Sequence, residues 1–67
     1  MSDEDAYAQC IGKAEAGNIY AQRTLGIGYE FGYRTKASNA EALKWYLMAA
    51  KNGNLLAQTA VGDLYIE

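Results

Sequence analysis

The chain has 67 residues and a formal net charge of −2, with one cysteine, no histidine and no proline. This length accommodates one domain, and because alanine supplies much of the 51% apolar content, only a small core can form. The composition excludes histidine-based catalytic triads, histidine metal clusters and an intrachain disulfide.

The charge pattern bears on location and on the class of partner. The first segment, Ser2-Asp3-Glu4-Asp5, is acidic where a secretion signal is basic, and no apolar run approaches the ~20 residues that span a bilayer. Together with the lone cysteine, this predicts a cytoplasmic chain with no membrane partner. The six basic residues form no stripe, which argues against nucleic acid as a partner. We expect no cofactor and no metal.

The first predicted helix covers residues 3–16. Its apolar residues follow the i, i+3, i+4, i+7 spacing of one helix face: Tyr7, Cys10, Ile11 and Ala14. Because Cys10 lies on this face, we expect it to be a buried, unreactive thiol. Gly17 suits the left-handed residue just past a helix end, and Asn18 is a favoured N-cap for the next helix.

The second predicted helix covers residues 19–30. The Gly17-Asn18 link leaves almost no loop, so the two helices should be antiparallel neighbours. We expect a narrow buried face made of Ala21, Leu25, Gly28 and Tyr29. Gly26 inside this helix costs about 1 kcal/mol relative to alanine. We attribute this glycine, and Gly62 at the same register of the fourth helix, to the close approach of a neighbouring helix, with a functional hinge as the alternative.

Residues 32–38 connect the first helix pair, residues 3–31, to a second pair, residues 39–67, in a single domain. Ser38 and Glu41 match a capping box at the start of a third helix over residues 39–52. Its apolar face contains Leu43, Tyr46, Leu47 and Ala50. A fourth helix runs from Leu55 to the end, with an expected buried face of Ala57, Val61, Leu64 and Tyr65.

The two halves are related by an offset of 36 residues. Seven identities fall among the 18 pairs that begin with residue 14, and Leu25 pairs with Val61 as a near match. The offset is typical of repeated helix pairs. The identical pairs are Ala14/Ala50, Gly17/Gly53, Asn18/Asn54, Ala21/Ala57, Gln22/Gln58, Gly26/Gly62 and Tyr29/Tyr65.

The sequence resembles the Sel-1-like repeat, a relative of the tetratricopeptide repeat. The resemblance rests on Ala14-x-x-Gly17-Asn18-x-x-Ala21-Gln22-x-x-Leu25-Gly26-x-x-Tyr29-x-x-Gly32 and on Ala42-Leu43-Lys44-Trp45-Tyr46-x-x-Ala49-Ala50-x-x-Gly53-Asn54. It implies an all-α fold of two antiparallel helix pairs stacked as a short right-handed α-solenoid. It also implies a non-catalytic scaffold for protein–protein interaction.

The connecting loop departs from the family pattern. Arg34 and Thr35 stand where the family carries a second glycine and a valine, although Gly32 is kept, and Ser38 replaces the family's aspartate. We therefore expect the loop to differ in shape while keeping its length.

The candidate protein-binding residues lie on the first helix of each pair, which lines the concave face in helical repeats. They are Gln9, Glu41, Lys44, Trp45, Met48 and Lys51, together with Tyr33 in the loop. Trp45 is either an aromatic anchor for a partner or a packing residue. Lys44 and Lys51 are either part of the binding surface or ordinary solvated residues.

The number of repeats needed for a stable fold indicates a second possible function. About three repeats are usually needed to cover the apolar faces of such units, and this chain holds two. The chain is then a piece of a longer array, an assembly unit that self-associates through the uncovered fourth helix with its Tyr65 and Ile66, or a stable miniature. A structural assembly unit is thus the alternative to a peptide- or protein-binding scaffold.

Overall fold

The computed structural model describes residues 3–66, and it describes side-chain surroundings for residues 5–64. Within this range the chain forms four helices and no strand, which confirms the all-α prediction. The helices are α1 (Asp3–Glu15), α2 (Ile19–Phe31), α3 (Asn39–Lys51) and α4 (Leu55–Ile66), each ending within one residue of the expected position.

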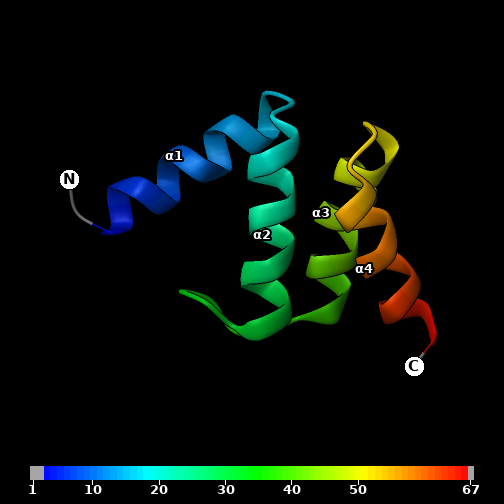
Figure 1. Ribbon diagram of the computed structural model, residues 1–67. Coiled ribbons are helices and arrows are strands. Elements are labelled where there is room, and N and C mark those ends of the chain that lie inside the picture. The colour runs from blue at the N-terminus through cyan, green and yellow to red at the C-terminus, as the bar shows by residue number, and fades with distance from the viewer. Residues whose placement is uncertain (1–2, 67) are drawn as a thin grey trace.

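The helices pack in chain order, α1 on α2, α2 on α3 and α3 on α4. Figure 1 shows α2, α3 and α4 grouped together, whereas α1 diverges from α2 with distance from the turn that joins them. The Cα positions extend over 37 × 24 × 14 Å, so the molecule is a flattened, elongated body. The start of α1 and the end of α4 lie at opposite ends of it (Figure 1).

The two short turns are built in the same way. Gly17 and Gly53 have φ angles of 105° and 100°, in the left-handed region that glycine adopts without steric cost. The backbone N–H of Asn18 donates to Lys13 O at 2.9 Å, and that of Asn54 donates to Ala49 O at 3.0 Å. These bonds satisfy carbonyls that would otherwise be unpaired at the helix ends.

Both asparagines also cap the helices that follow them. Asn18 Oδ1 accepts the Ala21 N–H at 2.9 Å, and Asn54 Oδ1 accepts the Ala57 N–H at 2.8 Å. The predicted caps are therefore confirmed.

A glutamine joins the two helices of each pair. Gln22 Nε2 donates to Ala14 O at 3.0 Å, and Gln58 Nε2 donates to Ala50 O at 3.2 Å. The same side chain thus links the same two positions in both halves of the chain. Gln22 is 2% exposed and also accepts a hydrogen bond from Asn52 Nδ2 at 3.4 Å, whereas the bond of Gln58 is exposed to solvent.

The connecting loop forms only half of the predicted capping box. The Ser38 hydroxyl accepts the Glu41 N–H at 3.2 Å, as expected. The Ser38 N–H donates to the backbone oxygen of Tyr29 at 2.7 Å rather than to the Glu41 side chain. This bond fixes the start of α3 to the last turn of α2.

The loop backbone contains two left-handed residues. Gly32 has φ 76° and Arg34 has φ 61°, the one positive φ of a non-glycine residue in the described chain. Arg34 therefore takes a glycine-like backbone conformation at the position that the resemblance assigns to glycine.

The core consists of two small clusters in which five of eight residues are alanine. Ala14, Ala21, Leu25 and Trp45 form the first, and Ala42, Tyr46, Ala49 and Ala57 form the second. Alanine in these positions lets helix backbones approach closely but limits the apolar area that each helix buries.

Gly26 confirms the predicted close approach of two helices. A Cβ at this position would lie 2.6 Å from two ring carbons of Tyr46, which is 2% exposed. The Tyr46 hydroxyl donates to Glu30 Oε1 at 2.7 Å, which holds the ring in place. The same prediction is wrong for Gly62, because a Cβ there would meet no atom of the described residues within 4 Å.

The other core predictions hold in part. Ala21, Leu25 and Ala57 are buried, Tyr29, Val61 and Leu64 are half-buried, and the side chain of Tyr65 lies outside the described residues, as does that of Ile66. Cys10 is half-buried rather than buried, because the divergence of α1 from α2 leaves it at the edge of their contact.

Candidate functional site

The predicted binding residues of α3 share one helix face. Lys44, Met48 and Lys51 are exposed, with Met48 at 37%, and Glu41 is half-buried. Trp45 is 8% exposed and belongs to the cluster formed with Leu25. This burial favours the alternative that Trp45 is a packing residue, since it leaves little indole surface for a partner.

Lys44 covers part of this tryptophan. Its Nζ lies 5.5 Å from the centroid of the Trp45 ring, within the range of a cation–π contact. The exposed surface of α3 therefore includes two ammonium groups, the flexible thioether of Met48 and the side chain of Leu47, which is 42% exposed.

The remaining two predicted residues lie elsewhere. Gln9 is exposed on α1, where it borders a hollow of about 370 Å³ against the first turns of α2. Tyr33 is 65% exposed in the connecting loop, where it lines a different cavity.

That cavity lies where α1 diverges from α2, and it has a volume of about 450 Å³. α1 supplies one wall, α2 the floor, and the connecting loop the other wall. Its lining residues are Ala6, Tyr7, Cys10, Thr24, Leu25, Ile27, Gly28, Tyr33 and Arg34.

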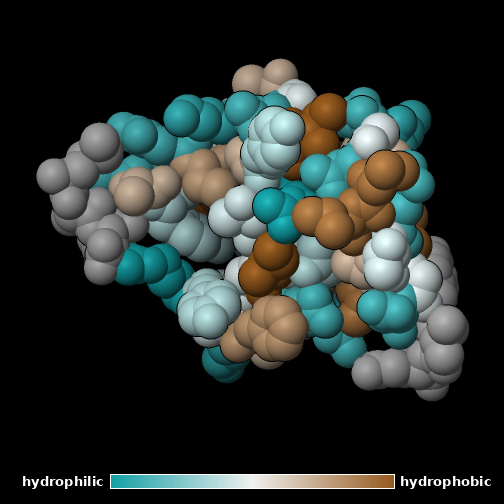
Figure 2. Space-filling view, viewed as in Figure 1, coloured by the Kyte–Doolittle hydropathy of each residue, from teal (hydrophilic) through white to brown (hydrophobic). Residues whose placement is uncertain are grey.

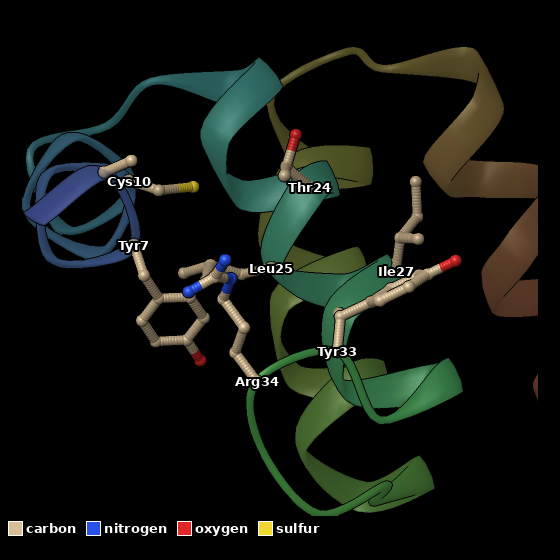
Figure 3. A pocket seen from close by; sticks show the side chains of 9 residues that line it. Tyr7, Cys10, Thr24, Leu25, Ile27, Tyr33 and Arg34 are labelled. Atoms are coloured by element: carbon tan, nitrogen blue, oxygen red, sulfur yellow. The ribbon is translucent and has the colours of Figure 1, made fainter. Parts of the chain in front are cut away.

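Figure 3 shows how the side chains of the cavity are arranged. Tyr7 and Cys10 project from α1, and Arg34 rises from the loop with its guanidinium group towards Leu25. Tyr33 lies beneath Ile27 at the other side. Arg34 is charged and the other lining residues named above are not, so the described lining is largely apolar.

α1 contributes two polar groups to the cavity, the Tyr7 hydroxyl and the Cys10 thiol. Burial raises the pKa of the Tyr7 hydroxyl above its usual value of 10.0, and the nearby Tyr29 raises it further by charge repulsion and by a hydrogen bond. The Cys10 thiol makes a weak hydrogen bond to Ala21 O at 3.7 Å. The chain contains no histidine, so no imidazole base lies beside either group.

Sequence reasoning missed this cavity. The departure at Arg34 was visible as a break in the repeat pattern, but it indicated only an altered loop. The cavity itself depends on the angle between α1 and α2, and no residue pattern within either helix specifies that angle.

A further exposed apolar surface lies over α2 and α4. Figure 2 shows apolar side chains gathered on this face of the molecule, interrupted by polar ones. The large apolar residues with the highest exposure are Leu55 at 74%, Tyr20 at 73%, Phe31 at 67% and Leu56 at 66%.

No cluster of potential metal ligands occurs among the described residues, and no helix in that part of the chain has the length and apolar character needed to cross a membrane. No family model, no curated protein and no solved structure matches the chain.

Proposed function

We propose that the chain is a non-catalytic helical-repeat module that binds a peptide or protein. The observation that carries the proposal is the repeated joint between helices: the same glycine turn, asparagine cap and glutamine-to-carbonyl hydrogen bond occur twice, 36 residues apart. Units of this kind stack side by side and offer a row of equivalent helix faces to a partner. In this proposal the pairs are antiparallel Sel-1-like repeats of a short right-handed solenoid.

The proposed contact surface is the exposed face of α3. Lys44 and Lys51 lie on either side of Met48, and all three are exposed. Lysine side chains attract acidic groups, and methionine adapts its shape to apolar ones. The module would therefore favour a partner segment that carries acidic and apolar residues.

A peptide-display selection against the folded chain tests this proposal. Enriched peptides are then titrated by fluorescence anisotropy against the wild type and the double variant Lys44→Glu/Lys51→Glu. Loss of two attractive charges and gain of two repulsive ones should weaken binding by about tenfold or more. Lys13→Glu, an exposed lysine on α1, is the matched control and should change the affinity little. Failure to enrich any peptide, or equal affinity for all three proteins, would refute the proposal.

The alternative, an assembly unit that stacks with further repeats or with itself, is favoured by one observation on α4. Gly26 of α2 lies against the ring of Tyr46 from the next helix, whereas a Cβ at the equivalent Gly62 of α4 would meet no atom of the described residues within 4 Å. Leu55 and Leu56 on the same helix are 74% and 66% exposed. In this alternative another helix covers α4 as α3 covers α2.

Concentration dependence distinguishes the two functions. Thermal unfolding of the wild type is followed at two concentrations about a hundredfold apart, since association raises the midpoint by mass action. Gly62→Leu is the matched variant because a Cβ at this position would meet no atom of the described residues within 4 Å. Assembly through α4 predicts a shift for the wild type and none for the variant. A midpoint independent of concentration for both would exclude self-assembly through α4.

A further inference from the structure

We propose that the exposed apolar surface over α2 and α4 is a second protein-binding surface, which takes a partner segment that presents a carboxylate between apolar side chains. Arg23 is the residue that pairs with this carboxylate. The surface is separate from the exposed face of α3, so it does not depend on whether that face binds a peptide.

The first argument is the place of Arg23 on α2. Ile19 and Ile27 lie four residues before and after it, so the three side chains follow one another along one side of the helix. Both isoleucines are half-buried and pack against the core cluster that contains Tyr46 of α3 and Ala57 of α4. Arg23 is therefore a cation within an apolar row that borders the other two helices.

The second argument is that Arg23 makes no ion pair with a carboxylate of the described chain. The residue is half-buried, and its Nε is buried without a hydrogen-bond partner among the described residues. Glu30, the one acidic residue of α2, accepts a hydrogen bond from the Tyr46 hydroxyl at 2.7 Å. Because the chain itself covers Nε, a partner carboxylate pairs with the two terminal nitrogens of the guanidinium, which suit two parallel hydrogen bonds.

The third argument is the exposed apolar area around Arg23. Tyr20, three residues before it, is 73% exposed, Phe31 at the end of α2 is 67% exposed, and Leu56 of α4 is 66% exposed. Figure 2 shows apolar side chains gathered over this side of the molecule. Arg23 is the one basic residue of α2 and α4, and neither helix contains a lysine. Aromatic residues and arginine are enriched in protein–protein interfaces, whereas lysine is depleted.

The fourth argument is that the repeated packing does not require an arginine at this position. Gln22, which bonds to the preceding helix, recurs as Gln58 with the same bond. Arg23, one position further on, is matched by Thr59 at the same offset. A buried donor without a partner is unfavourable for the folded chain. We therefore attribute Arg23 to the binding of a partner rather than to the packing of the helices.

The test uses the Lys44→Glu/Lys51→Glu protein as the bait in a peptide-display selection, because its α3 face repels acidic segments. We expect the enriched peptides to share an aspartate or glutamate between large apolar residues. Each peptide, and a copy with this carboxylate replaced by its amide, is titrated against the bait by fluorescence anisotropy. Loss of the charge-assisted pair should weaken binding by about tenfold or more. Absence of enriched peptides, or equal affinity for the amide copies, would overturn the proposal whatever the α3 face binds.

Variants of the bait locate the surface. Arg23→Gln should weaken the acidic peptides by the same factor and leave the amide copies unchanged, because both changes remove one interaction. Tyr20→Ala should weaken both kinds of peptide, because it removes exposed aromatic area. Lys13→Gln, which removes an exposed lysine of α1, is the matched control and should change neither affinity. Equal affinity of the bait and its Arg23→Gln variant for the acidic peptides would refute the assignment.

Two further measurements separate partner binding from a structural role and from self-association. The urea midpoint of Arg23→Gln should equal or exceed that of its parent, because Nε makes no hydrogen bond that the substitution removes. A clearly lower midpoint would show that Arg23 serves the fold and would overturn its assignment. Sedimentation equilibrium of the wild type over about a hundredfold range of concentration is the second measurement. Association that Arg23→Gln abolishes would assign the surface to a second copy of the chain and overturn the proposal.

Discussion

Replacing Gly26 with alanine tests the tight contact between α2 and α3. In an open helix interior, a change from glycine to alanine stabilises by about 1 kcal/mol, because alanine loses less backbone entropy on folding. At Gly26 the added Cβ would lie 2.6 Å from two carbons of the Tyr46 ring, closer than real Cβ contacts. The gain in helix propensity therefore competes with a steric clash.

The clash should exceed the gain. The Tyr46 ring is 2% exposed and its hydroxyl is held by Glu30 at 2.7 Å, so the ring cannot move aside without losing that hydrogen bond. Overpacking a buried site costs roughly 1–3 kcal/mol, and the rigid ring favours the upper part of this range. We expect Gly26→Ala to lower the free energy of unfolding by about 1–2 kcal/mol after the propensity gain of about 1 kcal/mol is included.

Gly12→Ala is the matched control, because a Cβ in this α1 position would meet no atom within 4 Å in the part of the chain that the structure describes. It should raise the free energy of unfolding by up to about 1 kcal/mol. The two variants should thus differ by roughly 2–3 kcal/mol, or about 10–20 °C in midpoint for a domain of this size. Urea and thermal unfolding followed by circular dichroism at low concentration measure this difference. A Gly26→Ala protein as stable as Gly12→Ala would show that α2 and α3 do not pack as described.

Three further variants or conditions test other contacts. Gln22→Ala should lower the free energy of unfolding in a urea titration by about 1–3 kcal/mol, because it leaves buried groups without a hydrogen-bond partner. Gln58→Ala removes an equivalent but exposed hydrogen bond and should lower it by less than about 1 kcal/mol. Equal losses of stability in the two variants would contradict the difference in burial. Arg34→Gly should raise the free energy of unfolding by about 0.5–1 kcal/mol, because the relief of left-handed backbone strain exceeds the effect of the entropy that glycine adds to the unfolded chain. A loss of stability would mean that the interactions of the arginine side chain contribute more than the strain costs. Burial is the largest cause that raises the pKa values of Tyr46 and Tyr7 above 10.0, followed by the hydrogen bond to Glu30 for Tyr46 and by charge repulsion from Tyr29 for Tyr7. The unfolded chain therefore loses these protons at a lower pH than the folded chain does. Stability should accordingly be intact below about pH 10 and fall as the pH rises further, and a Tyr46→Phe protein should show a shallower fall in urea midpoint; an unchanged slope would exclude Tyr46 as a source.

Features set by neighbouring residues were predictable from the sequence. Gly17 and Asn18 specify a helix end and a helix start through backbone conformation and one side-chain hydrogen bond, and the structure forms both. Ser38 acts in the same way for α3. Such signals involve residues at most a few positions apart, so a single sequence contains them in full.

Features that depend on the angle between helices were not predictable. Gly26 and Gly62 carry the same signal in the same register, yet only Gly26 meets a neighbouring ring. Cys10 lies on the expected face of α1, but the divergence of α1 from α2 leaves it half-buried beside a cavity. The cavity joins residues of α1, α2 and the loop, and nothing in their spacing indicates that they would meet.

The packing of α1 has a consequence for the motions of the chain. α1 has an extensive contact with one other helix, α2, whereas α2 and α3 each have extensive contacts with two helices. Segments with fewer buried contacts open at lower free energy than the rest of a domain. The amide hydrogens of α1 should therefore exchange with solvent when that helix detaches, whereas those of α2 and α3 should exchange only when the whole chain unfolds. The cavity wall that α1 supplies would then open and close as a unit, at a lower free energy than the unfolding of α2 and α3.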